Sequence, residues 1–188
     1  MLHASTAVAQ TEEDPEPEVS TAGPYSRMLA VAVNGGLDTP LGVIGAEIEF
    51  APIEWLNIYA GGGVSRSGAR VGGGVSFRAP LHSSAFGFQL GLAGGPMDWD
   101  SHAEGAENLT QHRYWEFALF AHAGMTYEYR WDEGIFGRIG IGAEALIAGD
   151  VTACAGPGTA ACSPEDTAGL AVPFRAWASL TVGYAFEL

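Results

Sequence analysis

Apolar and polar residues alternate along most of the chain from residue 25 onwards. In the segment LGVIGAEIEF, for example, Ile44 and Ile48 share one face while Glu47 and Glu49 share the other. A period of two predicts β-strands, because successive side chains of a strand point to opposite faces. We expect eight strands, at residues 27–34, 41–50, 54–65, 69–79, 85–95, 115–130, 136–149 and 172–188. No segment has the 3.6-residue period that predicts a helix.

The predicted connections between these strands sort into short and long ones. Those after the second, fourth and sixth strands are short, whereas those after the fifth and seventh are long. In an up-and-down meander of antiparallel strands, alternate connections lie at the same end. The sequence therefore predicts an all-β domain with short turns at one end and long loops, chiefly residues 94–112 and 150–168, at the other.

The composition of the two strand faces indicates which of them points inwards. The less apolar face consists mainly of Gly, Ala and Ser with a few charges of both signs; the chain has 27 Gly, and its eight basic residues are all Arg. A water-facing strand surface normally carries many Lys, Thr and Glu residues, whereas an eight-stranded barrel has an interior only just wide enough for side chains. We therefore expect the apolar face outside. The alternative is a soluble lipocalin-like carrier of small molecules, with the apolar face inside.

Aromatic residues of the apolar face fall near the ends of the segments. They are Phe50, Phe77, Phe86, Tyr127, Tyr129, Phe174 and Phe186. This placement is typical of the aromatic girdles at the two interfaces of a membrane. No stretch approaches the roughly 20 apolar residues of a membrane-spanning helix, but the strands of a membrane barrel cross with about ten residues each.

The last segment, VGYAFEL, carries an alternating stripe of Tyr184, Phe186 and Leu188. With the preceding alternating segments, it resembles the small eight-stranded outer-membrane β-barrels of Gram-negative bacteria, the OmpA/OmpX type, over residues 25–188. The resemblance implies an eight-stranded antiparallel up-and-down transmembrane β-barrel, with Tyr184, Phe186 and Leu188 as the signal that the barrel-assembly machinery recognises. The family usually ends in Phe, where this sequence has Leu188. The resemblance also implies a location in the bacterial outer membrane, among its lipid and lipopolysaccharide, but no single activity.

The first 22 residues differ in composition from the rest. The sequence AVAQ at positions 7–10 has the small-x-small pattern of a signal-peptide cleavage site, without the positive and apolar regions that normally precede it. We expect a signal-peptide remnant, with the true start upstream or the leader shortened. The following TEEDPEPE is acidic and Pro-rich and predicts a disordered segment. The barrel domain is expected at residues 23–188.

Two cysteines, Cys154 and Cys162, lie in a segment rich in Gly, Pro, Ser and Thr. Two cysteines in one loop predict a local disulfide and an oxidising compartment. The alternatives are two free thiols or a metal pair, but the spacing matches no zinc pattern.

Charged residues on the inward face predict a polar network in the lumen. The expected members are Glu47, Glu49, Arg70, Arg78, Glu116, His122, Glu128, Arg138, Glu144 and Arg175. Two interpretations are open: a fixed set of ion pairs that satisfies groups unable to face lipid, and a gated ion path whose pairs open. An eight-stranded lumen is filled by its own side chains, which favours the fixed set.

Other candidate chemistry is weaker. Four carboxylates in DWDSHAEGAE could bind a divalent cation, but their spacing lacks the pattern of a calcium loop. The neighbours Asp100, Ser101 and His102 have the residue types of a catalytic triad, although adjacent residues rarely reach its geometry. Binding to nucleic acid is disfavoured by the net charge of -14, because a phosphate backbone requires a basic surface. We expect no enzyme activity, metal or cofactor.

The sequence thus predicts a monomeric, non-enzymatic outer-membrane protein with a surface or membrane-organising role. Its outer loops would contact a partner whose identity the sequence leaves open. The alternative within the membrane is a narrow channel for small solutes through the lumen.

Overall fold

The computed structural model describes residues 25–102, 110–149, 151–155 and 174–186. Within these ranges the chain forms β-strands and no helix. The strands are β1 (Leu29–Leu37), β2 (Ile44–Ile53), β3 (Leu56–Ser65), β4 (Gly68–Leu81), β5 (Ser84–His102), β6 (Thr110–Arg130), β7 (Ile135–Ala148), β8 (Val151–Ala155) and β9 (Phe174–Phe186). The described part of the chain accordingly contains no helix long and apolar enough to cross a membrane.

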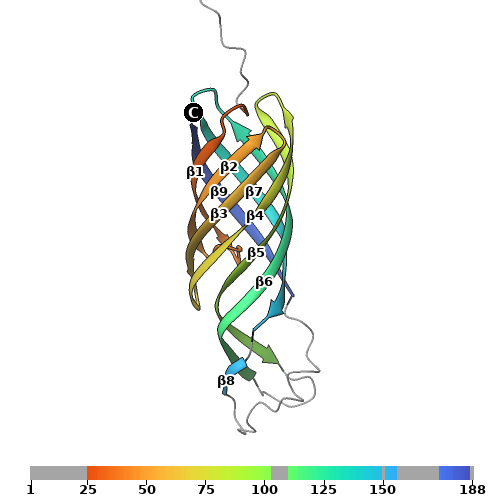
Figure 1. Ribbon diagram of the computed structural model, residues 1–188. Helices are drawn as coiled ribbons and strands as arrows, with labels where there is room; N and C mark the ends of the chain where they lie inside the picture. The colour runs from red at the N-terminus through yellow and green to blue at the C-terminus, as the bar shows by residue number, and fades with distance from the viewer. Residues whose placement is uncertain (1–24, 103–109, 150, 156–173, 187–188) are drawn as a thin grey trace, which may run out of the picture.

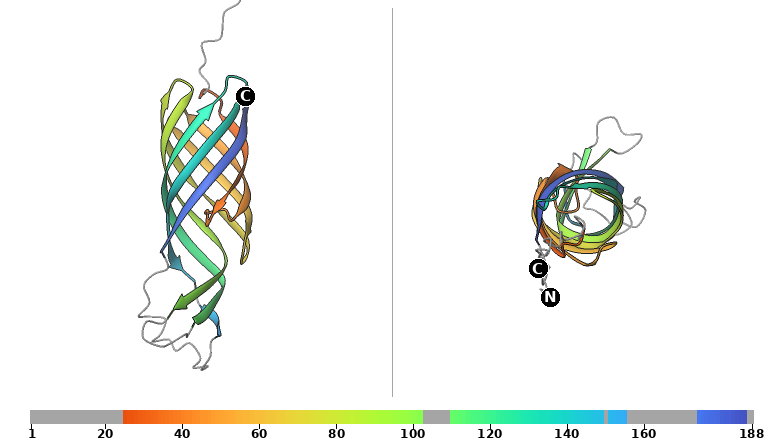
Figure 2. Two further views of the ribbon diagram at one scale, coloured as in Figure 1. Left: turned by 180° about the vertical axis from the view of Figure 1, so that it is seen from behind. Right: turned by 90° about the horizontal axis from the view of Figure 1, so that it is seen from above.

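Eight of the described strands close into an antiparallel barrel (Figure 1). Each of β1 to β6 pairs with the next strand in sequence, and β9 pairs with both β7 and β1 to complete the ring. The view along the axis in Figure 2 shows the closed wall. The predicted eight-stranded antiparallel barrel is confirmed. The remaining strand, β8, lies outside the ring and pairs only with the beginning of β6.

The two ends of the barrel differ in their connections. The end that carries the short turns at residues 54–55, 82–83 and 131–134 also holds Tyr25 and the end of β9, and we call it the turn end. The opposite end carries the connections at residues 38–43 and 66–67, and we call it the loop end. In Figure 1 the turn end is at the top.

The prediction of a long loop at residues 94–112 is wrong for most of that segment. Residues 97–102 continue β5 and pair with residues 110–115 of β6, so the two strands project beyond the rest of the wall as a hairpin (Figure 1). The segment lies beyond the apolar part of the wall and is polar, and polarity of this kind is also typical of a loop. Backbone pairing holds a hairpin in register without an apolar face. The segment predicted as a loop at 150–168 contains β8, and its residue 150 and everything after residue 155 lie outside the described ranges.

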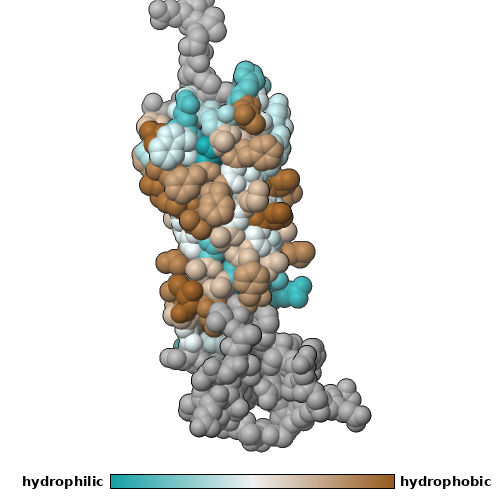
Figure 3. Space-filling view, turned by 90° about the vertical axis from the view of Figure 1, so that its right-hand side faces the viewer, coloured by the Kyte–Doolittle hydropathy of each residue, from teal (hydrophilic) through white to brown (hydrophobic). Residues whose placement is uncertain are grey.

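The apolar face of the wall points outwards. The side chains of Phe88, Leu90, Ile141 and Val182 are between 41% and 65% exposed, whereas Glu144 is 1% exposed. Figure 3 shows hydrophobic side chains gathered in patches on one flank of the barrel, with paler residues between them. The predicted orientation of the two faces is confirmed.

Glycines on the inner face make room for a few large inward side chains. A Cβ atom at Gly124 would lie 2.6 Å from Cη2 of Trp177, and one at Gly142 would lie 2.5 Å from Cζ2 of the same ring. A Cβ at Gly91 would lie 2.7 Å from Cε1 of His122. Small residues and large ones therefore alternate in space, which is how so narrow a lumen is filled.

Exposed aromatic rings gather at the turn end. Four pairs have ring centroids between 4.9 and 6.4 Å apart: Trp55–Phe77, Phe86–Tyr127, Tyr129–Trp131 and Tyr184–Phe186. At the loop end, Phe117 and Phe174 are exposed singly. Six of the seven predicted aromatic positions lie at the turn end and Phe174 alone lies at the loop end, so the aromatic residues are dense at one end of the wall and sparse at the other.

Candidate functional site

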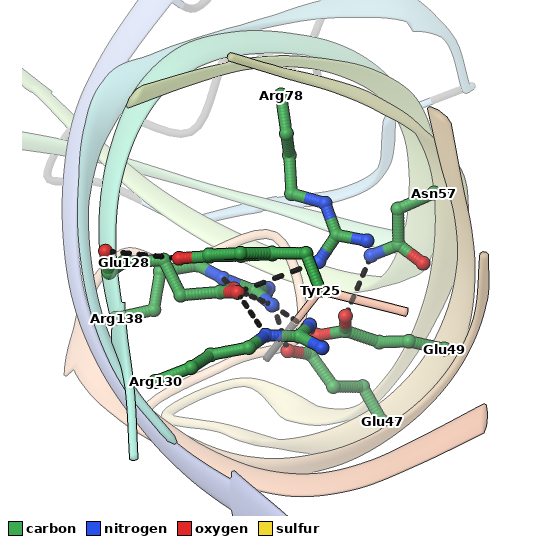
Figure 4. A network of polar contacts seen from close by, with 8 residues as sticks. All are labelled: Tyr25, Glu47, Glu49, Asn57, Arg78, Glu128, Arg130 and Arg138. Carbon is green, nitrogen blue, oxygen red and sulfur yellow. Dashed lines mark hydrogen bonds and ion pairs between the residues drawn. The ribbon is translucent and has the colours of Figure 1, made fainter. Parts of the chain in front are cut away.

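Charged side chains from four strands meet in the lumen near the turn end (Figure 4). We call this group the turn-end cluster; its members are Glu47 and Glu49 of β2, Arg78 of β4, Glu128 and Arg130 of β6, and Arg138 of β7. All six are less than 10% exposed. They reach one another because each occupies an inward position of its strand.

Arg138 joins three carboxylates of the turn-end cluster. Its Nη2 lies 2.5 Å from Oε1 of Glu49 and 2.6 Å from Oε2 of Glu128. Its Nη1 lies 3.4 Å from Oε1 of Glu47. Since β2 and β7 are separated in the ring by β1 and β9, this guanidinium ties distant parts of the wall together across the lumen.

Glu128 is the carboxylate that pairs with all three guanidiniums of the turn-end cluster. Its Oε1 accepts a hydrogen bond from Nε of Arg130 at 2.6 Å and one from Nη1 of Arg78 at 3.4 Å. Its Oε2 accepts from Nε of Arg138 at 2.7 Å. The cluster, as defined, has three carboxylates and three guanidiniums, so its charges balance when all are ionised. Charges buried in this way are tolerated only when paired and hydrogen-bonded.

Tyr25, just before β1, covers the turn-end cluster. Its ring centroid lies 4.8 Å from Cζ of Arg130 and 5.5 Å from Cζ of Arg78, which is cation–π geometry. Its hydroxyl donates to the backbone carbonyl of Glu128 at 3.4 Å. Burial raises the pKa of the Tyr25 hydroxyl well above its ordinary value, so the side chain remains a neutral donor. Figure 4 shows the ring lying across the converging charges.

A second group of charges lies towards the loop end. We call Arg70 of β4, Glu144 of β7 and Arg175 of β9 the loop-end triad. Arg70 donates from Nη1 and Nη2 to the two oxygens of Glu144 at 3.3 and 3.2 Å, and Arg175 donates from Nη2 to Oε1 of the same carboxylate. The Cζ atoms of Arg70 and Arg175 lie 5.0 and 4.8 Å from the ring centroid of Phe120.

An apolar cluster stands beside the loop-end triad. Met97, Trp115, Ala118 and Phe120 pack together, and none is more than 4% exposed. These side chains come from the parts of β5 and β6 where the hairpin leaves the wall. The lumen is therefore occupied by apolar and charged side chains near the loop end and by the turn-end cluster near the other.

Between the two charged groups the described lumen contains a cavity of about 30 Å³. Tyr59 and His122 face each other beside it, with 2.6 Å between the hydroxyl and Nε2, and Trp177 lines another side. A water molecule requires roughly 10–15 Å³ of such space. The cavity is therefore large enough for a few waters at most and too small for a hydrated ion or a solute.

Most members of the predicted lumen network lie where the sequence placed them. Glu47, Glu49, Arg70, Arg78, His122, Glu128, Arg138 and Glu144 are buried, and the side chain of Arg175 is 16% exposed. They form two groups, with His122 paired to Tyr59 between them.

The placement of Glu116 in the lumen is wrong, since this residue is exposed. The pairing of β5 with β6 shifts between Gly95 and Met97, which lie opposite Ala118 and Trp115. Two steps along β5, from Gly95 to Met97, thus face three steps along β6, from Ala118 to Trp115, which is a β-bulge. Glu116 and Phe117 both point outwards there, so the regular alternation of the strand is broken at this point.

Some lumen residues were missed in the sequence. Arg130 is two residues beyond Glu128, so strand alternation alone could have identified it. Asn57 donates from Nδ2 to Oε2 of Glu49 at 2.6 Å, and it too occupies an inward position. Tyr25 precedes the first strand, where no periodic pattern could indicate its direction.

Several predicted features fall outside the described residues. They are the disulfide between Cys154 and Cys162, the terminal Leu188, the leader at residues 1–22 and the side chains of Asp100, Ser101 and His102. Tyr184 and Phe186 are described and point outwards, 43% and 38% exposed. Among the described residues, no three His, Cys, Asp or Glu side chains are placed to hold a metal ion.

Comparison with protein-family models, curated proteins and solved structures finds no match to this chain. The family resemblance of the sequence therefore remains a prediction.

Proposed function

We propose that this chain is a transmembrane β-barrel of the bacterial outer membrane with a structural, non-enzymatic role. The observation that carries the proposal is the inside-out distribution of side chains: large apolar residues are exposed around the wall while charges are buried within it. In water such a surface would be a strong aggregation hazard, because soluble monomers rarely expose apolar patches beyond a few hundred Å². In a bilayer it would be the stable arrangement.

The dimensions of the wall support the same placement. The strands β1, β2 and β3 have 9, 10 and 10 residues. Ten residues tilted by about 40° span roughly 25 Å, which is the height of the apolar band of a membrane barrel. The belt of aromatic pairs at the turn end supports a membrane interface there.

The closed ring also provides hydrogen-bond partners for the backbone N–H and C=O groups of the wall. Each wall strand pairs with a neighbour on both sides, so the apolar part of the wall leaves no open edge. Unpaired backbone groups are too costly to place in hydrocarbon, and full closure is the only way for a sheet to avoid them.

The contents of the lumen favour an anchor over a channel. The turn-end cluster, covered by Tyr25, and the apolar cluster beside the loop-end triad lie in series along the axis, and the cavity between them is about 30 Å³. The charged interior equally disfavours a lipocalin-like carrier, whose ligand cavity is apolar. On this proposal the barrel holds the β5–β6 hairpin and β8 on the outer side of the membrane, where they are available to a partner.

Cell fractionation tests the proposal. The protein, expressed with a functional secretory signal in a Gram-negative host, is expected in the outer-membrane fraction, where it requires detergent for extraction. Folded protein from that fraction should also migrate differently on a gel before and after boiling. Recovery of folded protein from the aqueous periplasmic fraction without detergent would contradict the membrane placement and favour the carrier.

A further inference from the structure

The charges of the lumen are unevenly distributed along its axis. Among the described residues, the turn-end cluster pairs three Arg with three Glu, whereas the loop-end triad has two Arg and one Glu. The excess positive charge of the lumen is thus concentrated at the triad. Because the triad is largely buried, water and salt screen this charge much less than they screen an exposed one.

The hydrogen-bonding capacity of the triad is also incompletely used. Glu144 already accepts from Arg70 with both oxygens and from Arg175 with Oε1. The Nε of Arg175 is buried and has no hydrogen-bond partner among the described residues. A buried donor of a charged group without a partner is costly, and an additional acceptor would remove that cost.

The triad borders a pocket at the loop-end mouth of the barrel. The pocket has a volume of about 230 Å³, and Arg70 and Arg175 line it together with the exposed Arg66 and with Ser65 and Ser67. These residues come from the end of β3, from the turn between β3 and β4, and from inward positions of β4 and β9. The guanidinium-bearing residues Arg66, Arg70 and Arg175 therefore border a space large enough for a small solute.

Two carboxylates, those of Asp38 and Asp98, also line the pocket. Both residues are exposed, so their charges act through water and are weakened by it. Together with Glu144 they equal in number the guanidiniums of Arg66, Arg70 and Arg175, so the positive excess is confined to the buried triad.

We propose that this pocket binds a small soluble anion through a carboxylate or phosphate group, with Arg175 and Arg70 as its principal ligands. A guanidinium presents paired N–H donors that match the two oxygens of either group. The anion would enter from solvent at the loop end, because the triad lies inside the wall and away from its apolar outer face. This binding site is additional to the anchoring role and does not depend on membrane placement.

The test is calorimetric titration of the folded barrel in a maltoside detergent, which itself carries no phosphate. Inorganic phosphate and succinate are titrated separately, at constant ionic strength set with chloride. We expect saturable one-site binding of at least one of them, with a Kd of about 1 mM or below. The comparison of the two probes shows which anionic group the pocket prefers. A heat of binding that does not saturate for either probe would overturn the proposal. This part of the test uses the wild-type protein alone and does not depend on the folding of any variant.

Three variants locate the site. Arg175→Gln should weaken binding by about tenfold or more, because a charge-assisted hydrogen bond is lost. Glu144→Gln should tighten binding several-fold, since it removes the carboxylate that competes for both guanidiniums. Arg27→Gln makes the same charge change as Arg175→Gln but at the turn end, where Arg27 contacts the backbone carbonyl of Asp132; it should bind like the wild type. Equal affinity of the Arg175→Gln and wild-type proteins, or equal losses in the two Arg variants, would overturn the assignment.

Discussion

Arg138 and Glu49 meet across the lumen, with 2.5 Å between Nη2 and Oε1, although 89 positions separate them in the chain. Their strands are not neighbours in the wall, so the ion pair is a tertiary contact that the backbone pairing does not provide. The same guanidinium also binds Glu47 and Glu128. Arg138 is therefore the residue whose loss should disturb the lumen most.

Arg138→Gln should destabilise the folded barrel by about 3–5 kcal/mol, because removing one partner leaves buried carboxylates without their counter-charge. Arg138→Lys should cost less, since it keeps the charge and loses only the forked geometry. The free energies of unfolding in urea, measured for the barrel in lipid vesicles, check this order. Equal stability of wild type and Arg138→Gln would show that the network contributes no net stabilisation.

The turn-end cluster and the apolar cluster that contains Phe120 each block the lumen, and together they predict how single-channel conductance should respond to mutation. Wild-type protein should give no single-channel steps in a planar bilayer, and Arg138→Ala alone should remain silent because Phe120 and its apolar neighbours still fill the loop end. The double variant Arg138→Ala with Phe120→Ala should conduct. Regular steps from the wild-type protein would instead favour the narrow-channel function.

A charged side chain on the outer face should lower the stability of the barrel more, the deeper it lies in the membrane. Ile141 lies in the middle of β7 and is 65% exposed, so Ile141→Arg should reduce stability in vesicles by about 2–4 kcal/mol. Leu37 is 71% exposed at the loop-end limit of β1, and Leu37→Arg should cost only about 0–1 kcal/mol. Urea titration of the two variants side by side makes the comparison, and equal costs would argue against an apolar band with this depth.

Two glycines of β7, the inward-facing Gly142 and the outward-facing Gly137, predict a steric contrast within one strand. A Cβ at Gly142 would collide with the ring of Trp177 and the carbonyl oxygen of Ala123, whereas one at Gly137 would have no neighbour closer than 3.9 Å. Gly142→Ala should therefore destabilise the barrel by about 1–3 kcal/mol, as overpacking does elsewhere. Gly137→Ala should be nearly neutral by the same unfolding measurement. A neutral Gly142→Ala would mean that Trp177 can move aside without loss.

The fold could be predicted because its main signal is local. The alternation of Ile44 and Ile48 with Glu47 and Glu49 determines which side chains share a face, whatever the rest of the chain does. The direction of the faces followed from composition, because Gly-rich strand faces suit a narrow lumen and not a water-exposed surface. Neither inference required knowledge of which strands pair.

The errors concern features that depend on pairing between strands. Glu116 points outwards because a bulge in β6 shifts its register against β5, and nothing in the local pattern shows where a bulge falls. The hairpin beyond the wall has polar residues and so gave no periodic signal. Tyr25 reaches the turn-end cluster from outside any strand, and only the three-dimensional arrangement of Arg78 and Arg130 explains its position.

Refolding from urea into dimyristoylphosphatidylcholine vesicles tests the central claim most directly, by comparison with dilution into the same buffer without lipid. We predict β-sheet circular dichroism and a heat-modifiable gel band only when vesicles are present, because the exposed apolar wall needs hydrocarbon around it. A folded, monodisperse protein in lipid-free, detergent-free buffer would contradict the account.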